Sequence, residues 1–151
     1  MKRIIALLLA VMTVFALTAC GGKTTTVDAQ SLAKALAEKT AFESELSAVS
    51  KEELGYYFQL PAKCDAAAYM SSGSTAEEIF VIECYDGASA AALRTSMQDF
   101  LDSQKTEMER YLPAEVDRIN GAIFETYGTC VVLCVTSDTD TANAVIKEYV
   151  G

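Results

Sequence analysis

Four cysteines, Cys64, Cys84, Cys130 and Cys134, are the side chains best suited to metal binding or redox chemistry. Cys130 and Cys134 lie in one apolar run, where strand geometry puts them on the same face but ~13 Å apart. Two thiolates on one zinc ion lie no more than about 4.6 Å apart, and a disulfide needs Cα atoms within about 7 Å. This pair therefore forms neither. We predict four structural thiols without metal; the alternative is one disulfide, with Cys84 opposite Cys130 if their strands are neighbours.

Ser31 and Lys34 match the S-x-x-K spacing of penicillin-interacting serine enzymes. The S-D-N and K-T-G elements that those enzymes also need are missing from the sequence. The sequence contains no histidine, which removes the usual general base and the Ser-His and Cys-His nucleophile pairs. We therefore predict that the protein is not an enzyme, has no catalytic residues and uses no cofactor.

Two acidic pairs also fit known sites only in part. Asp138 and Asp140 begin like a calcium loop, but the positions that follow lack the required glycine and further Asp or Asn. Helix capping accounts for them. Glu77 and Glu78 are adjacent at the start of an expected strand, so they point to opposite faces and cannot form a catalytic carboxylate pair. We predict that both are solvated charges at a strand edge.

The stretch Leu17-Thr18-Ala19-Cys20 ends an uncharged run that begins at Ile4, directly after two basic residues. A basic start, an apolar core and small residues before the break are typical of a secretory signal peptide. The last four residues resemble the bacterial lipobox, which implies a diacylglyceryl group on the Cys20 sulfur and cleavage just before it. We expect a mature protein that is lipid-anchored on the extracytoplasmic face of the cell membrane.

These features predict three parts: a lipoprotein signal peptide over 1–19, a lipidated cysteine with a short flexible tether over 20–27, and a single α+β domain over 28–151. The net charge of the whole chain is −9, and loss of the basic leader makes it −11. Such an acidic protein is repelled by nucleic acids and by anionic headgroups. We expect contact with the membrane through the lipid on Cys20, an unknown protein or envelope partner, and no nucleic acid.

Hydrophobic periodicity and capping residues predict the helices. One follows Asp28, a short one follows the capping box that begins at Ser50, and a last one follows Asp138 or Asp140. The clearest is a long amphipathic helix over 88–112. Its expected apolar stripe consists of Leu93, Met97, Phe100, Leu101, Met108 and Tyr111.

Four strands are expected, at 66–71, 78–85, 122–126 and 129–136, because β-branched and aromatic residues are frequent there. The second and fourth are apolar on both faces, which places them in the middle of a covered sheet. We therefore predict a four-stranded antiparallel sheet of order 1-2-4-3. The long helix would pack on one face, and the N-terminal helices or the C-terminal helix on the other.

Certain residues of this layout are similar to those of an uncharacterised family of small Gram-positive bacterial lipoproteins, which carry a domain of unknown function numbered 4358. The residues that carry the resemblance, spread over 28–150, are Ala76-Glu77-Glu78-Ile79, Gln104, Tyr111-Leu112-Pro113-Ala114-Glu115 and Gly128. The resemblance implies a lipoprotein with an α+β domain, and it implies no activity. We expect a non-enzymatic binding or interaction module at the cell envelope; the alternative is a small-ligand (solute) binding lipoprotein.

Overall fold

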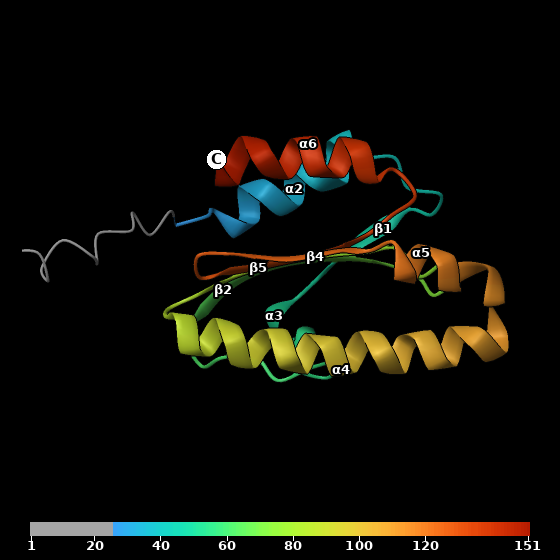
Figure 1. Cartoon of the computed structure of the whole chain (residues 1–151), viewed down its shortest axis with the longest axis horizontal. Helices are drawn as coiled ribbons and strands as arrows, with labels where there is room; N and C mark the ends of the chain where they lie inside the picture. The colour runs from blue at the N-terminus through green and yellow to red at the C-terminus, as the bar shows by residue number, and fades with distance from the viewer. Residues whose placement is uncertain (1–25) are drawn as a thin grey trace, which may run out of the picture.

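Residues 26–151, which the computed structural model describes, form an antiparallel sheet with helices on both faces (Figure 1). The predicted signal peptide and the predicted lipidation site, Cys20, lie outside these described residues. In chain order the elements are α2 (Ala29–Lys39), β1 (Leu46–Val49), α3 (Lys51–Leu54), β2 (Cys64–Ser71), β3 (Glu78–Cys84), α4 (Gly87–Tyr111), the 3-10 turn η2 (Pro113–Glu115), α5 (Val116–Asn120), β4 (Ile123–Tyr127), β5 (Cys130–Val135) and α6 (Thr139–Val150).

The sheet has five strands in the order β1-β2-β3-β5-β4. The α+β class is confirmed, but the predicted four-stranded sheet is wrong because Leu46–Val49 adds a strand at the β2 edge. β1 pairs antiparallel with β2, with Leu46 opposite Ser71 and Val49 opposite Ala68. The strand is short and its two middle residues are exposed, so its sequence carries little of the apolar signal that marks a strand.

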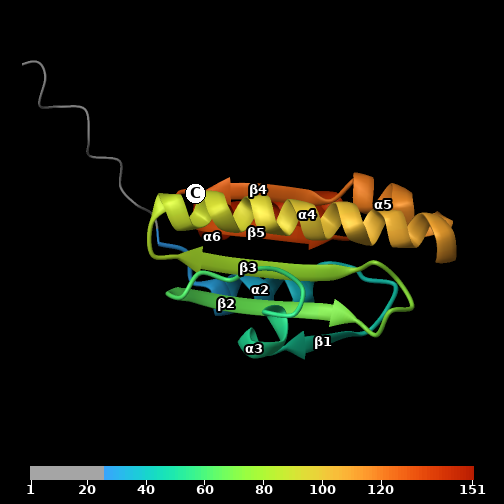
Figure 2. The ribbon, with the colours of Figure 1, turned by 90° about the horizontal axis from the view of Figure 1, so that it is seen from below.

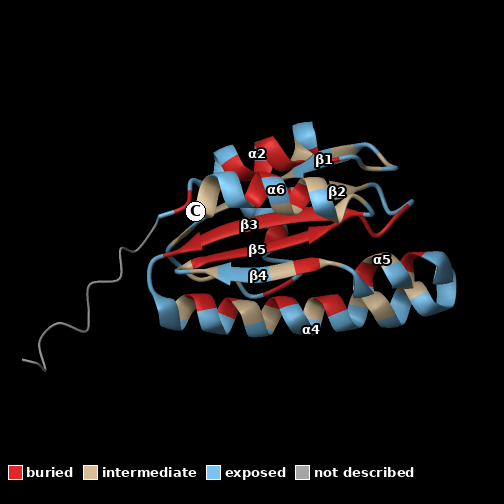
Figure 3. Ribbon diagram, turned by 45° about the horizontal axis from the view of Figure 1, so that its top comes forward, coloured by how far each residue is buried: buried red, intermediate tan, exposed pale blue. Residues whose placement is uncertain are grey.

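β3 and β5 form the centre of the sheet, and every residue of both strands is buried (Figure 3). They pair antiparallel, with Phe80 opposite Leu133 and Val81 opposite Val132. Strands that are covered on both faces need apolar side chains in both directions, which explains why these two runs do not alternate with polar residues.

Helices α2 and α6 cover one face of the sheet, and α4 crosses the other (Figures 1 and 2). On the first face Leu36 and Ile146 pack against Val81; on the second, Leu93 and Met97 pack with Phe80. All six side chains are at most 1% exposed. Among residues 26–151, no helix has both the length and the apolar character needed to cross a membrane.

The apolar stripe of α4 is shorter than the sequence predicts. Ala90, Leu93, Met97 and Leu101 are buried, but Tyr111 is 75% exposed and does not belong to the core. Phe100 is half-buried, with its ring centroid 5.8 to 5.9 Å from those of Tyr57, Phe58 and Phe80. The helix runs past the end of the sheet in Figure 2, and of its last turn Met108 still packs against the core while Tyr111 does not.

The predicted helix caps are confirmed and fix where the helices begin. Asp28 accepts a hydrogen bond from the Ser31 amide at 2.9 Å, and Ser50 and Glu53 form both bonds of a capping box. Asp138 caps α6, so Asp140 lies in its first turn. Gly128 has φ of +62° in the β4–β5 turn, a conformation that favours glycine.

Candidate functional site

A hollow of about 550 Å³ lies at the end of the sheet where the described chain begins. In Figure 2 this is the end where β3 finishes and α4 starts. We call it the N-terminal hollow. Its walls are formed by Thr26, Lys51, Ala62, Lys63, Cys64, Asp65, Glu83, Cys84, Tyr85 and Thr129.

The charged groups of the N-terminal hollow differ in how many contacts they already make with other residues of the protein. The Glu83 carboxylate accepts hydrogen bonds from the Val27 amide, at 3.1 Å, and from the Thr129 hydroxyl. It therefore anchors the segment before α2 to β3. The Lys63 ammonium lies 5.2 Å from the ring centroid of Tyr85, which is 76% exposed. An exposed ring beside a cation offers an external partner both apolar and charged contact.

This arrangement suits binding better than catalysis. The Cys64 thiol lines the hollow and donates to the Pro61 carbonyl at 3.4 Å rather than to a base. The Lys51 ammonium donates to the Cys64 carbonyl at 2.6 Å, so its nearest partner is also a backbone oxygen. A catalytic nucleophile–base pair needs a neighbouring base that accepts the proton of the nucleophile, and neither contact supplies one.

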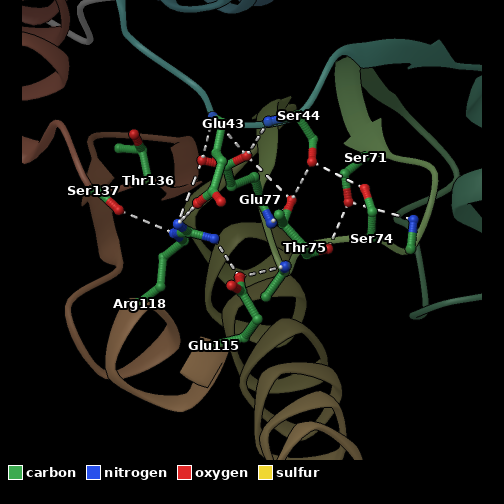
Figure 4. Close-up of polar contacts among 12 residues, drawn as sticks. Glu43, Ser44, Ser71, Ser74, Thr75, Glu77, Glu115, Arg118, Thr136 and Ser137 are labelled. Carbon is green, nitrogen blue, oxygen red and sulfur yellow. Dashed lines mark hydrogen bonds and ion pairs between the residues drawn. The ribbon is translucent and has the colours of Figure 1, made fainter. Parts of the chain in front are cut away.

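The far end of the sheet holds a second polar site, centred on Glu77 and Arg118 (Figure 4). Glu77 is 2% exposed, so the prediction that it is a solvated edge charge is wrong. Its carboxylate accepts hydrogen bonds from the amides of Glu43 and Ser44 at 2.9 to 3.0 Å, and from the Thr75 hydroxyl at 3.1 Å. These donors hold the loop before β1 against the β2–β3 turn.

Arg118 lies beside this carboxylate, with its Nε 3.8 Å from Glu77 Oε1. The same guanidinium donates to Ser137 at 3.0 Å, to Glu43 at 2.6 Å and to Glu115. Glu115 in turn accepts from the Ala76 amide at 2.9 Å. Arg118 thus joins α5, the loop before β1 and the β5–α6 connection.

This Glu77–Arg118 cluster stabilises the fold and has little capacity left for a ligand. All three guanidinium nitrogens contact oxygen atoms of the protein, and the Arg118 side chain is only 11% exposed. A hollow of about 330 Å³ lies beside it, but each of the three guanidinium nitrogens of the arginine that lines this hollow already donates to a protein oxygen. We therefore assign the cluster a structural role.

Glu78 is buried on the opposite face, at 1% exposure, so the prediction that it is solvated is also wrong. Burial raises the pKa of this carboxyl to about 8, although a hydrogen bond from Gln104 Nε2 at 3.1 Å opposes the shift. Within residues 26–151 no protein donor reaches Glu78 Oε1, and Gln104 Oε1 also lacks one. If Glu78 is protonated, its carboxyl has a hydroxyl that can donate a hydrogen bond, so the two oxygens no longer both lack a donor. This fits a Glu78 side chain that is neutral at pH 7.

The remaining predicted site residues are not brought together. Ser31 and Lys34 are both exposed, and Lys34 lies 3.7 Å from Glu38 rather than beside the serine. Asp138 accepts from the amides of Ala41 and Thr141, as a cap and loop anchor. Within the described part of the chain, no three Cys, Asp, Glu or His side chains gather closely enough to hold a metal ion.

The four cysteines divide between the two faces of the sheet and are not bonded. Cys130 and Cys134 face α2 and α6, and burial raises the pKa of each thiol to about 12. Cys84 faces α4, with Cys64 beside it at the edge of the same cluster. The suggested opposition of Cys84 and Cys130 is wrong, because Cys130 pairs with Glu83 in the register.

Sequence reasoning missed Arg118, Tyr85 and Gln104 as site residues. The sequence places several carboxylates near expected strand and helix ends, which indicates that an arginine could pair with one of them. Nothing in the sequence shows which carboxylate Arg118 contacts. Tyr85 could have been noticed as a large aromatic residue placed between a buried strand and a helix cap.

One family model matches the chain, over residues 38–136, and its description is Domain of unknown function (DUF4358). Comparisons with curated proteins and with solved structures find no match. The matched range contains the whole Glu77–Arg118 cluster except Ser137, and the whole Glu78–Gln104 pair.

Proposed function

The chain belongs to the DUF4358 family, whose description assigns no activity, and we propose that it is a lipid-anchored extracytoplasmic module that binds an envelope partner through the N-terminal hollow. The proposed partner is a protein or another envelope component, and no chemical reaction is involved. The proposal combines a lipid anchor, which the sequence predicts at Cys20, with a binding surface, the N-terminal hollow, which is found in the fold.

The anchor is supported by Leu17-Thr18-Ala19-Cys20, which resembles a lipobox after an apolar run with a basic start. A diacylglyceryl group on Cys20 supplies two acyl chains, and two chains hold a small domain on a membrane stably where one does not. The net charge of −9 does not favour binding to anionic lipid headgroups. Contact with the membrane would therefore depend on the lipid attached to Cys20.

The position of the N-terminal hollow supports its role as the partner-binding surface. Thr26 lines the hollow, and six residues separate Cys20 from Val27. Six residues span at most about 20 Å when fully extended. An anchor at Cys20 would therefore keep this end of the domain near the membrane, where a membrane-bound envelope partner is concentrated.

The single observation that carries the proposal is the side chain of Tyr85. It is 76% exposed at the rim of the hollow, with the Lys63 ammonium 5.2 Å from its ring centroid. Tyrosines with this combination of apolar area and a polar hydroxyl are enriched in protein interfaces and at membrane surfaces.

A small ligand is the second candidate, and the volume of the hollow favours it. About 550 Å³ lies within the range of ordinary small-molecule sites. Lys63 and Asp65, both exposed at its wall, would offer a ligand one charge of each sign. Native mass spectrometry of the purified protein distinguishes this candidate, because a bound small molecule adds a discrete mass and a membrane partner does not.

Photo-crosslinking in intact cells tests the proposal directly. A photoreactive phenylalanine analogue at Tyr85 should capture a discrete envelope partner, which mass spectrometry then identifies as protein, glycan or lipid. The same analogue at Tyr111 is the matched control. The two tyrosines are 76% and 75% exposed; Tyr85 lies two residues before α4 and Tyr111 is its last residue, and the 25 residues of this helix span about 37 Å.

We expect the Tyr85 position to capture the partner at least several-fold more efficiently than the Tyr111 position. Capture from Tyr111 with none from Tyr85 would contradict the assignment of the hollow, since the binding surface would then lie at the other end of the helix.

A further inference from the structure

We propose that Cys64 and Cys84 are a site of oxidative modification, at which a reversible disulfide closes the wall of the N-terminal hollow. The two residues are directly opposite each other in the β2–β3 register. Partners in such a register project to the same face of the sheet, and both cysteines pack with the cluster beneath α4.

The backbone hydrogen bonds show which kind of pair this is. The Cys84 amide donates to the Thr129 carbonyl at 3.0 Å, so the backbone polar groups of Cys84 point toward β5 and away from β2. At the other end of the hairpin the Ser71 amide donates to the Glu77 carbonyl. Because hydrogen-bonded and non-hydrogen-bonded pairs alternate, the odd-numbered residues of β2 form the hydrogen-bonded pairs with β3. Cys64 and Cys84 therefore form a non-hydrogen-bonded pair.

This geometry matches the requirement of a disulfide. Non-hydrogen-bonded antiparallel pairs have Cα atoms about 4.5 Å apart and closely spaced side chains. Disulfides join cysteines whose Cα atoms lie about 4.4–6.8 Å apart. The bond can therefore form without a change of register, whereas Cys130 and Cys134 lie on the opposite face of the sheet.

The two thiols differ in access, which gives the reaction an order. Both residues line the hollow, but Cys64 is half-buried whereas Cys84 is only 4% exposed. A small-molecule disulfide such as oxidised glutathione can reach Cys64 from solvent. The Cys64 thiolate attacks one sulfur of that oxidant, forms a mixed disulfide and releases one reduced glutathione.

The second step closes the protein disulfide. The Cys84 thiolate attacks the Cys64 sulfur and expels the second reduced glutathione, so two protein thiols are oxidised and one glutathione disulfide is reduced to two thiols. Burial, with smaller contributions from the neighbouring Cys64, Glu83 and Asp86, raises the pKa of Cys84 to about 11. Ring closure should therefore accelerate as the pH rises, by up to about tenfold per unit.

The bond would change the surface proposed for binding. It would join the first residue of β2 to the last residue of β3, at the point where Lys63 and Tyr85 leave their strands. The rim of the hollow would then be held by a covalent bond in oxidising surroundings and released in reducing ones. Neither the lipid anchor nor a partner is needed for this chemistry.

The test uses full-length protein purified in detergent under reducing conditions and then exposed to oxidised glutathione at pH 7, 8 and 9. Free thiols are alkylated, and cleavage after glutamate separates the two cysteines for mass spectrometry. We expect one linkage, Cys64 to Cys84, that dithiothreitol reverses. We also expect the mixed disulfide on Cys64 to persist longest at pH 7, and reduction to lower the melting temperature by roughly 5–10 °C.

Cys64→Ser is the matched variant, because its hydroxyl fits the half-buried site. It should keep the wild-type circular dichroism spectrum, form no linkage and melt at the same temperature with or without dithiothreitol. The proposal is overturned if Cys64 and Cys84 both remain alkylatable after oxidation of folded wild-type protein, or if the linkage joins a different pair.

Discussion

Arg118→Met should lower the melting temperature by roughly 10–20 °C. The change removes the only cation within 4 Å of the buried Glu77 carboxylate among the described residues and keeps most of the apolar stem. Removing one partner of a buried ion pair costs about 3–5 kcal/mol, because the other charge stays buried without its counter-ion. For a domain of this size that loss corresponds to the stated shift, which thermal unfolding followed by circular dichroism would measure.

Two further variants separate charge from packing. Arg110→Met changes an exposed arginine in the last turn of α4 and should alter stability by less than about 0.5 kcal/mol. The double variant Glu77→Gln/Arg118→Met removes both charges and should recover part of the lost stability. An Arg118→Met protein that melts like wild type would show that the cluster in Figure 4 contributes little to the fold.

Glu78→Gln should make the protein more stable than wild type at pH 8, by several kcal/mol, and should have little effect at pH 4. The Glu78 carboxyl has a raised pKa of about 8 in the folded protein and an ordinary value of 4.5 when the chain unfolds. Between these values the folded state holds a proton that the unfolded state has lost. The contribution of Glu78 to stability is therefore complete below pH 4.5 and falls by about 1.4 kcal/mol per unit up to pH 8.

Urea unfolding at intervals between pH 4 and pH 9 measures this effect as the difference between variant and wild type. Taking the difference cancels the contributions of other carboxylates, which change stability with pH in the opposite direction. Asp28 and Asp138 are examples, because backbone hydrogen bonds lower their pKa values. Glu125→Gln, on the exposed part of β4, is the control and should leave the pH dependence unchanged. A constant difference between Glu78→Gln and wild type across the range would mean that Glu78 is ionised in the folded protein.

Local signals predicted much of the fold. Asp28 and Ser50 identified helix starts because a cap depends on residues three positions apart. β3 and β5 were recognisable because a strand that is buried on both faces consists of a nearly continuous run of apolar residues. β1 was missed because its four residues derive their strand conformation from pairing with β2, which is a nonlocal contact.

The polar interior was not predictable in the same way. Glu77 and Glu78 were expected to be solvated, since an isolated buried carboxylate is costly. Their burial depends on Gln104, which lies within α4, and on Arg118, which follows that helix; both contact the start of β3 from far along the chain. Sequence spacing cannot show which distant donor compensates a given acid.

The residues that carry the family resemblance help to build these buried contacts. Glu78 receives a hydrogen bond from Gln104, and Glu115 receives one from the Ala76 amide. Gly128 makes the turn between the last two strands. These residues of the motifs maintain the fold, whereas the N-terminal hollow contains Lys63 and Tyr85, which lie outside the motifs.

The most direct test of the central proposal, a lipid-anchored extracytoplasmic module, is intact-mass and N-terminal peptide mass spectrometry of the protein isolated from membranes of its host. The account predicts a chain that begins at Cys20 and carries diacylglyceryl mass on that residue, and Cys20→Ala should remain an unmodified precursor. A wild-type protein that keeps residues 1–19, or that begins at another residue without lipid, would contradict it.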